Sequence, residues 1–504
     1  TIGIHDFDIT LLANAEKLQY WSDGLVNSQF FPSDILGYHA MGIGQDPRVT
    51  SNDRVYTRDA LLGRLNYILA SKYYLTLALR RDGYSAFGQA NPRAYFPTAA
   101  VAWKISEENF FNSEKIDFLK LRLSWGANGN SAIGTYSALA SMDAGKYLYS
   151  EGGVAYPVSV LFLSNMANSS LQWEKTTATN MGIDFGILNS RLNGSIEGYL
   201  SKTTGLLVDR SLPTITGFSS VAANLGQINN KGLELTINSN NLNLNNFIWK
   251  SNFNCSLNKN KIVSLYGDME DIIDEETEQV IGQKESDDYE NGWFIGQSVD
   301  VVWNYKSDGI WQVEDANLAA SYGGYLPGHF RMVDVNDDGK YTDLEDKQFL
   351  GFSRPQFRWN LNNDFTIMKN FSLSFTLYGH HGHIDTYRDE RGYSRFAAGD
   401  SRMNTYDIKY WTPENRSNKY PRMVDYEGYI YGVKYYKKGF VRLNDITIGY
   451  SFPERINQYL HLKSLKVYGR VENVHVWTNW PGWDPENTGG PSPRYFNLGV
   501  NVSL

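Results

Sequence analysis

The chain has 504 residues, more than a single ordinary globular core holds, and its formal net charge is −8. The acidic balance, without a basic cluster interleaved with aromatics, argues against a nucleic-acid partner, and no run of about 18 apolar residues could form a helical membrane span. Cys255 is the only cysteine, which excludes an intrachain disulfide and a cysteine-based metal cage.

The N-terminal region starts at Thr1 instead of a methionine, and no charged segment followed by an apolar one marks a secretion leader. We therefore expect either that a leader was removed or that the sequence is an excerpt of a longer chain. The first strand is predicted around residues 6–19, DFDITLLANAEKLQ. In the segment KYYLTLALR that follows later, every second residue from Tyr73 to Leu79 is apolar, so these residues share one face of a strand.

The same alternation recurs to the end of the chain. The second face of these segments carries Lys, Arg, Glu, Ser, Thr and Asn, which suits a wet surface. We count about fifteen such segments, most of them close to the roughly 10 residues that a tilted membrane strand needs. Examples are LKLRLSW at 119–125, GLELTIN at 232–238, FSLSFTLY at 371–378, LKVYGRVE at 465–472 and FNLGVNVSL at 496–504.

The connections between these segments alternate in length. Short turns such as Lys369-Asn370 are followed by long polar stretches such as 381–437 and 478–494. Short turns at one end and long loops at the other are typical of a transmembrane antiparallel β-barrel, with the long loops outside. The regions 259–291 and 306–356 are both long, although one of them would have to lie on the side of the short turns. We therefore expect a further strand in this part of the chain. A soluble β-sandwich or propeller stays open on the pattern alone, because its strands alternate too.

Several stretches together resemble the SusC/RagA family of TonB-dependent outer-membrane transporters. Their order and spacing extend over nearly the whole chain. They are RLNYILASKYYLTLALRRDG at 64–83, YFPTAAVAWKISEENFF at 95–111, LKLRLSWGANGN at 119–130, the long stretch 171–207 that begins LQWEKTTATN, LGQINNKGLELTI at 225–237, DVNDDGKYTDLEDKQFLG at 334–351, FVRLNDITIGYSFP at 440–453, and the C-terminal segment.

The resemblance implies an all-β fold, a barrel of about 22 strands in the outer membrane of a Bacteroidota-type bacterium. It also implies an N-terminal plug domain, a TonB box and a SusD-like surface lipoprotein that acts as a lid. Neither plug nor TonB box is recognised within residues 1–504, which resemble the later part of the barrel. The first and the last strand are therefore expected to pair with strands of a further barrel and plug segment.

The function that the resemblance implies is active import of oligosaccharides, coupled to TonB through the plug. Peptide import by the same family, a passive porin or adhesin barrel, and a soluble secreted β-rich glycosidase are the alternatives. No GxSxG elbow, Walker loop or HExxH motif occurs, so we predict that the protein is not an enzyme.

The stretch DVNDDGKYTDLE has oxygen ligands at the alternating positions of a calcium loop, with Gly339 at the sharp turn. A structural calcium ion is therefore predicted, although an acidic, solvated turn without metal is the alternative. The candidate ligands are Asp334, Asn336, Asp338, the backbone carbonyl of Lys340, Glu345 and the neighbouring Asp346.

Aromatic residues gather in the two C-terminal long loops. Aromatic rings stack on the apolar faces of sugars and carboxylates bind hydroxyl groups, so these loops could bind an oligosaccharide. Packing within the loops, contact with the lid and, for Trp477, a place in the interfacial aromatic belt are the alternatives. The candidate substrate-binding residues are Trp480, Trp483, Asp484, Tyr426, Tyr429 and Tyr431.

The motif GHHGH places His380, His381 and His383 near the outer mouth. Loop histidines at this spacing can bind zinc, but no fourth ligand is evident nearby and solvated histidines are the alternative.

Overall fold

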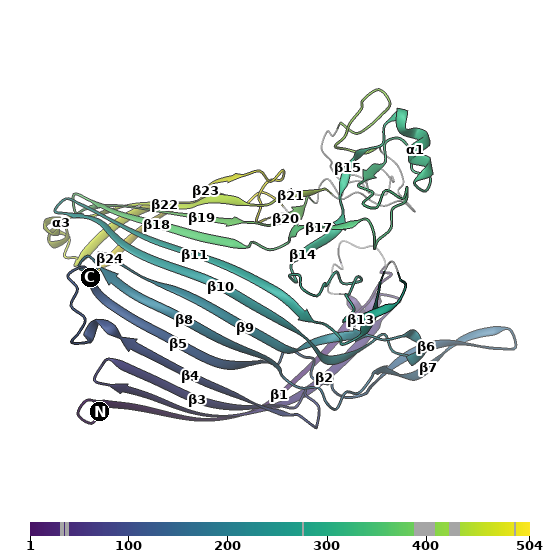
Figure 1. The fold of residues 1–504 in the computed structure, drawn as a ribbon, viewed down its shortest axis with the longest axis horizontal. Coiled ribbons are helices and arrows are strands. Elements are labelled where there is room, and N and C mark those ends of the chain that lie inside the picture. The colour runs from purple at the N-terminus through teal and green to yellow at the C-terminus, as the bar shows by residue number, and fades with distance from the viewer. Residues whose placement is uncertain (31–34, 36–39, 275–276, 388–408, 423–433, 488–489) are drawn as a thin grey trace.

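The computed structural model describes all residues except 31–34, 36–39, 275–276, 388–408, 423–433 and 488–489. Fourteen strands form one continuous antiparallel sheet that is twisted and curved (Figure 1). In the order of the sheet these are β1 (His5–Val26), β2 (Arg48–Leu69), β3 (Tyr73–Tyr84), β4 (Arg93–Lys104), β5 (Ile116–Asn130), β8 (Glu174–Ile187), β9 (Leu192–Ser211), β10 (Ser220–Leu244), β11 (Phe247–Ser264), β18 (Phe357–Ile367), β19 (Phe371–His381), β22 (Phe440–Ser451), β23 (Ser464–Thr478) and β24 (Tyr495–Ser503).

The other strands among the described residues form five two-stranded sheets within the connections. These pairs are β6 (Ser141–Glu151) with β7 (Val154–Asn165), β12 (Met269–Ile273) with β13 (Val280–Glu285), β14 (Val301–Tyr305) with β17 (Lys347–Phe352), β15 (Ser307–Ile310) with β16 (Phe330–Met332), and β20 (Ile384–Thr386) with β21 (Tyr435–Lys437). The helices are α1 (Ala316–Ser321) and α3 (Glu454–Tyr459), with short 3-10 turns η2 (Met41–Ile43), η3 (Ile105–Glu107), η4 (Thr214–Thr216) and η5 (Val313–Asp315). No helix in the described part of the chain is long and apolar enough to cross a membrane.

The strand pairing places the apolar rows on one face of the sheet. One line of paired residues crosses eleven strands on this outer face: Phe7, Tyr67, Leu75, Val101, Leu123, Met181, Gly198, Leu233, Leu257, Phe357 and His381. On β1 and β2 the line lies close to the short turn that follows β2. On β19 it has reached His381, at the end of the sheet that carries the long connections. The strands are therefore staggered, as in a tilted barrel wall.

The outer rows are exposed although they are apolar, which decides between a sandwich and a membrane barrel. Met181 is 55% exposed, Leu498 84% and Val500 57%, whereas a sandwich would bury such a row against a second sheet. On the opposite, inner face, Arg122 forms ion pairs with Asp184 and Glu197. The predicted all-β membrane sheet, with an apolar face for lipid and a polar face for water, is confirmed.

The two ends of the sheet differ in their connections. The turns after β2, β8, β10 and β18 are short, and together with α3 they lie at the end that also holds both termini (Figure 1). The long connections lie at the other end, which is the extracellular end of an outer-membrane barrel. The buried hydrophobic clusters lie in these connections and at the strand ends next to them, for example Tyr305, Ile310 and Trp411, so the described residues form no apolar core inside the sheet.

The expectation of a further barrel-wall strand between residues 291 and 306 was wrong. The strand that lies there, β14, pairs with β17, whereas β11 pairs directly with β18, so the described residues of 265–356 form one extracellular connection. Several strands have close to the expected ten residues, such as β24 with 9 and β18 with 11, whereas β10 has 25 and β1 has 22.

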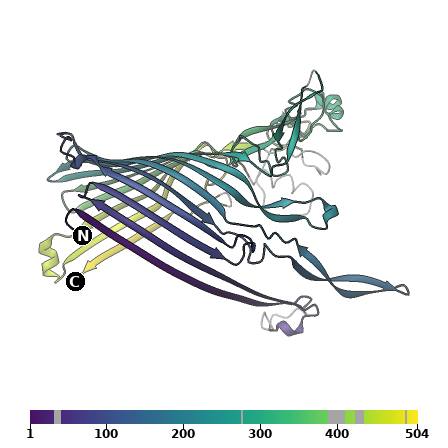
Figure 2. The same cartoon turned by 60° about the horizontal axis from the view of Figure 1, so that its bottom comes forward.

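The sheet is open between its first and last strands. Within the described residues, β1 pairs only with β2 and β24 only with β23 (Figure 2). The pairing of both edges with further barrel strands stays a prediction.

Candidate functional site

The inner face of the sheet is polar and hydrogen-bonded. The guanidinium of Arg122 lies 2.7 Å from a carboxylate oxygen of Asp184 and 2.7 Å from one of Glu197. Further along the same face, on β10 and β11, Asn254 donates to Asn252, and Asn252 donates to Asn238, each at 2.6 Å. Such a surface of fixed charges and amides favours water and polar solutes, as the lumen of a transport barrel requires.

At the extracellular end, a buried ion pair attaches the connection between β23 and β24 to the barrel wall. Arg442 on β22 donates from Nη2 to Asp484 Oδ1 at 2.7 Å, and both side chains are 4% exposed. Its Nε donates to Glu486 at 2.9 Å, and Tyr378 donates to the same carboxylate. Asp484 Oδ1 also accepts the backbone N–H of Glu486 at 2.8 Å. The loop therefore has a fixed position at the mouth.

The surroundings of Asp484 explain why it stays charged. Burial acts to raise its pKa, but the hydrogen bonds from Arg442 and from the Glu486 N–H hold the pKa below its usual value. Sequence reasoning missed Arg442, because its partners follow 42 and 44 residues later and no local pattern connects them. The only available signal was an arginine in the inner row of FVRLNDITIGY.

The predicted substrate-binding residues occupy different environments. Trp480 is 6% exposed, lies edge-on to the rings of Tyr387 and Tyr436, and has Lys438 Nζ 5.5 Å from its ring centroid. Trp483 is 66% exposed. Trp480 and Asp484 thus belong to the packed base of the mouth loops, whereas Trp483 offers a free ring.

The three predicted tyrosines and Trp477 complete the set of aromatic candidates. Tyr426, Tyr429 and Tyr431 lie outside the described residues. Trp477 is on the outer row of β23, where it pairs with Val441 and packs against His475, so it faces away from the lumen.

The predicted calcium loop adopts the sharp turn expected of it, with Gly339 at a φ of 78°. Its carboxylates accept backbone N–H groups: Asp334 from Gly339 at 2.9 Å, and the fully buried Asp346 from Val335 at 2.8 Å and from Thr342 at 2.7 Å. Asp338 accepts from the Lys340 N–H and Glu345 from the Thr342 hydroxyl, whereas the Asn336 side chain accepts from the Asp338 N–H. In the part of the chain that the structure describes, no three His, Cys, Asp or Glu side chains converge as a metal site.

The three histidines of GHHGH point to different places. His380 is on the inner row and packs against Phe440, with the ring centroids 5.1 Å apart. His381 is on the outer row and accepts a hydrogen bond from Trp359 at 3.1 Å. His383 lies beyond the strand and is buried. They therefore do not form a common zinc site.

The family model "TonB dependent receptor-like, beta-barrel" matches residues 6–474. The chain belongs to this family. TonB-dependent receptor β-barrels are outer-membrane proteins, which confirms the predicted location. The family consists of receptors and transporters, which confirms the prediction that the protein is not an enzyme.

The relatives agree with the resemblance seen in the sequence. TonB-dependent receptor P3 of Formosa agariphila is 32% identical over 88% of this chain and 45% of its own length. TonB-dependent receptor SusC of Bacteroides thetaiotaomicron is 28% identical over 100% of this chain and 49% of its own. The chain thus spans about half the length of the curated relatives it matches.

Among solved structures, the RagAB peptide transporter superposes with a TM-score of 0.75 at 22% identity, covering 100% of this chain and 54% of that one. At this identity, the likeness supports the fold alone.

Proposed function

We propose that the chain forms the later part of the barrel of a SusC-type, TonB-dependent importer. The observation that carries this proposal is the two-faced sheet: an exposed apolar outer face suits lipid, and an ion-paired inner face suits a hydrated lumen. A passive porin has the same faces, so energy coupling is the distinguishing property. TonB would act through a plug that a further segment of the protein provides.

Uptake by cells that produce the full-length protein tests this proposal. Labelled oligosaccharide should accumulate only while the inner membrane is energised, and dissipating the proton gradient should abolish accumulation. Uptake that persists without energy would identify a passive pore.

Oligosaccharides are the proposed cargo. The support is the exposed ring of Trp483, which precedes Asp484 in the loop that Arg442 holds in place, because a flat aromatic surface in a fixed position suits stacking on a sugar. Peptides are the alternative cargo, and the structure whose fold this chain shares is described as a peptide transporter. Competition between a labelled oligosaccharide and a peptide mixture separates the two.

Replacing Trp483 by Ala in the full-length transporter is expected to weaken oligosaccharide binding by roughly five- to tenfold, as expected for losing about 1 kcal/mol of stacking. Trp477→Ala is the matched control, because Trp477 is similarly exposed but on the outer face. Isothermal titration of both variants measures the effect. Equal affinity of the Trp483 variant and the unchanged protein would show that this ring is not part of the binding surface.

A SusD-like lipoprotein is the proposed partner, and the β6–β7 hairpin is a surface on which it could rest. The hairpin projects beyond the rest of the sheet (Figure 1) and exposes Leu148 at 69% and Leu161 at 70%. An isolated two-stranded hairpin is marginally stable in water, and a large exposed apolar surface indicates an interaction site.

Calcium in the 334–346 loop is a further proposal. The acidic loop and its glycine turn support it. For calcium to bind, the carboxylates of Asp334 and Asp338 would have to turn from the backbone N–H groups that they accept towards the ion. With calcium at 100 times its dissociation constant, hydrogen exchange of the loop amides should slow by up to about 100-fold, corresponding to about 2.7 kcal/mol. Asp338→Asn should remove the response. The same exchange rates with calcium and with chelator would leave the loop as a metal-free turn.

A further inference from the structure

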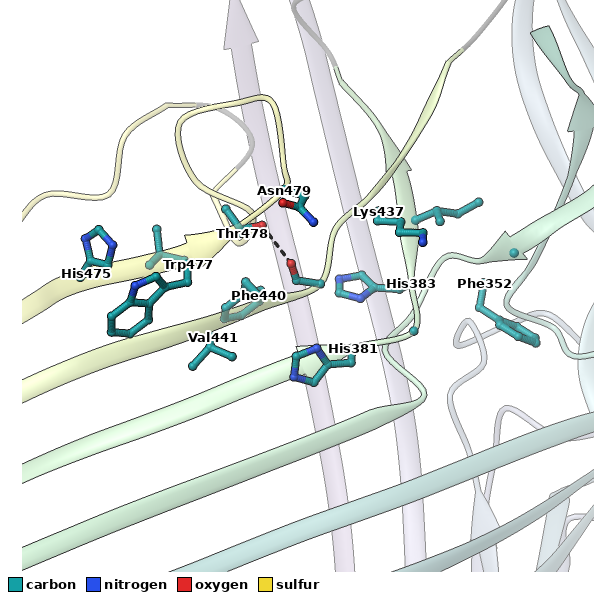
Figure 3. A pocket seen from close by; sticks show the side chains of 15 residues that line it. Phe352, His381, His383, Lys437, Phe440, Val441, His475, Trp477, Thr478 and Asn479 are labelled. Carbon is teal, nitrogen blue, oxygen red and sulfur yellow. Dashed lines mark hydrogen bonds between the residues drawn. The ribbon is translucent and has the colours of Figure 1, made fainter. Parts of the chain in front are cut away.

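A cavity of about 970 Å³ opens on the outer face where β19, β22 and β23 reach the extracellular end (Figure 3). We call it the rim cavity; its polar lining consists mainly of His381, His383, Lys437, His475, Thr478 and Asn479. The strand register places it outside the lumen, since His381 pairs with Phe357 and Trp477 with Val441 on the outer rows. It therefore lies where the barrel wall emerges from the outer leaflet.

The charge of the lining points to an anion. Three imidazoles and one ammonium group line the cavity, and no carboxylate is among the described residues of the lining. The nearby Asp385 forms an ion pair with Lys438 at 2.8 Å. Lys437 is exposed, and among the described residues it has no ion pair. A lysine in a basic pocket next to the membrane favours an anionic headgroup.

Two histidines have hydrogen-bonding capacity that the described residues do not use. Because His381 Nε2 accepts from Trp359, its neutral ring carries the proton on Nδ1, beside Gly439. His383 is 8% exposed, and its buried Nδ1 has no hydrogen-bond partner in the described part of the chain. A buried polar atom without a protein partner is typically satisfied by an ordered water molecule or an ion.

The apolar part of the lining points to a lipid as the source of the anion. Trp477 and Val441 continue the outer apolar rows of β23 and β22 into the cavity, so a headgroup seated there would have its acyl chains along the next outer-row residues, Leu443 and its partner Leu377. A free anion would not use these apolar contacts. A metal ion is disfavoured, because no three ligand side chains converge among the described residues.

We propose that the rim cavity binds the phosphorylated headgroup of an outer-leaflet lipid. Lys437 provides the charge, His381 and His475 provide N–H donors, and Trp477 lies at the boundary between headgroup and acyl chains, as aromatic side chains do at membrane interfaces. Binding at this position would fix the barrel wall relative to the leaflet without entering the transport path.

The test measures lipid retention by the full-length protein, purified in detergent and supplied with a bisphosphorylated glycolipid of the lipid A type or with its dephosphorylated form. Native mass spectrometry should show at least tenfold more retention of the phosphorylated form. Lys437→Ala and His475→Ala together should remove this preference, and Lys437→Arg should keep it. Lys463→Ala is the matched control, because Lys463 is an exposed lysine at the opposite end of the barrel.

Each other outcome overturns the proposal. Equal retention of the two glycolipids, or an unchanged preference in the double variant, would show that the cavity does not recognise phosphate. Inorganic phosphate that binds as tightly as the lipid would show a site for free phosphate instead. Zinc bound with loss of retention would identify a metal site. Lys437 is exposed, so a correctly inserted Lys437→Ala single variant provides the same readout if the double variant fails to assemble.

Discussion

Replacing Arg442 by methionine should release the extracellular loop between β23 and β24 from the barrel wall. The substitution keeps most of the side-chain volume but leaves the buried Asp484 carboxylate and its neighbour Glu486 without their cation. Removing one partner of a buried ion pair costs about 3–5 kcal/mol. We therefore expect hydrogen exchange of residues 479–487 to accelerate by more than a hundredfold.

The controls separate the lost ion pair from general damage. Arg470→Met removes an arginine that is 41% exposed and lies 3.3 Å from Glu472, so its cost should stay below about 1 kcal/mol. Combining Arg442→Met with Asp484→Asn should restore part of the loss, because an amide oxygen still accepts the Glu486 N–H without leaving a charge buried. If both arginine variants show the same exchange rates as the unchanged protein, the loop is held by other contacts.

The second large effect concerns the lipid-facing rows. Arginine in place of Phe375 or Val500, both midway along their strands, should cost about 2–4 kcal/mol of membrane stability. The same substitution at the adjacent Ser374 or Asn501, which face the lumen, should cost little. Refolding into lipid vesicles, followed by denaturant unfolding, measures the difference. Equal tolerance on the two faces would contradict the orientation of the sheet.

The strands could be predicted from the sequence because apolar and polar residues alternate within each short segment, independently of its partners. A segment such as FSLSFTLY shows by itself which residues share a face, and the structure confirms that Phe371 and Phe375 are on the outer row. The same alternation places His380 and His381 on opposite faces, which argues against a common metal site without any knowledge of pairing.

Remote contacts could not be predicted in the same way. The pairing of β11 with β18 spans residues 265–356, and a long insertion costs little loop-closure entropy, so nothing in the sequence marked it as one connection. The burial of Trp480 beside an exposed Trp483 depends on rings from other segments, including Tyr387 and Tyr436. The rim cavity lies where the ends of three strands meet, and the alternation within each strand does not show how their ends are placed relative to one another.

The open edges provide the most direct test of the central claim that this sheet is one part of a larger barrel wall. Unpaired backbone groups in hydrocarbon cost several kcal/mol each, so neither β1 nor β24 should remain unpaired in the membrane. The decisive measurement is a cryo-EM map of the native protein purified from the outer membrane. We expect β1 and β24 each to hydrogen-bond to strands outside residues 1–504, around a plug. A map in which β24 pairs directly with β1, closing a plugless barrel of the fourteen strands, would contradict this account.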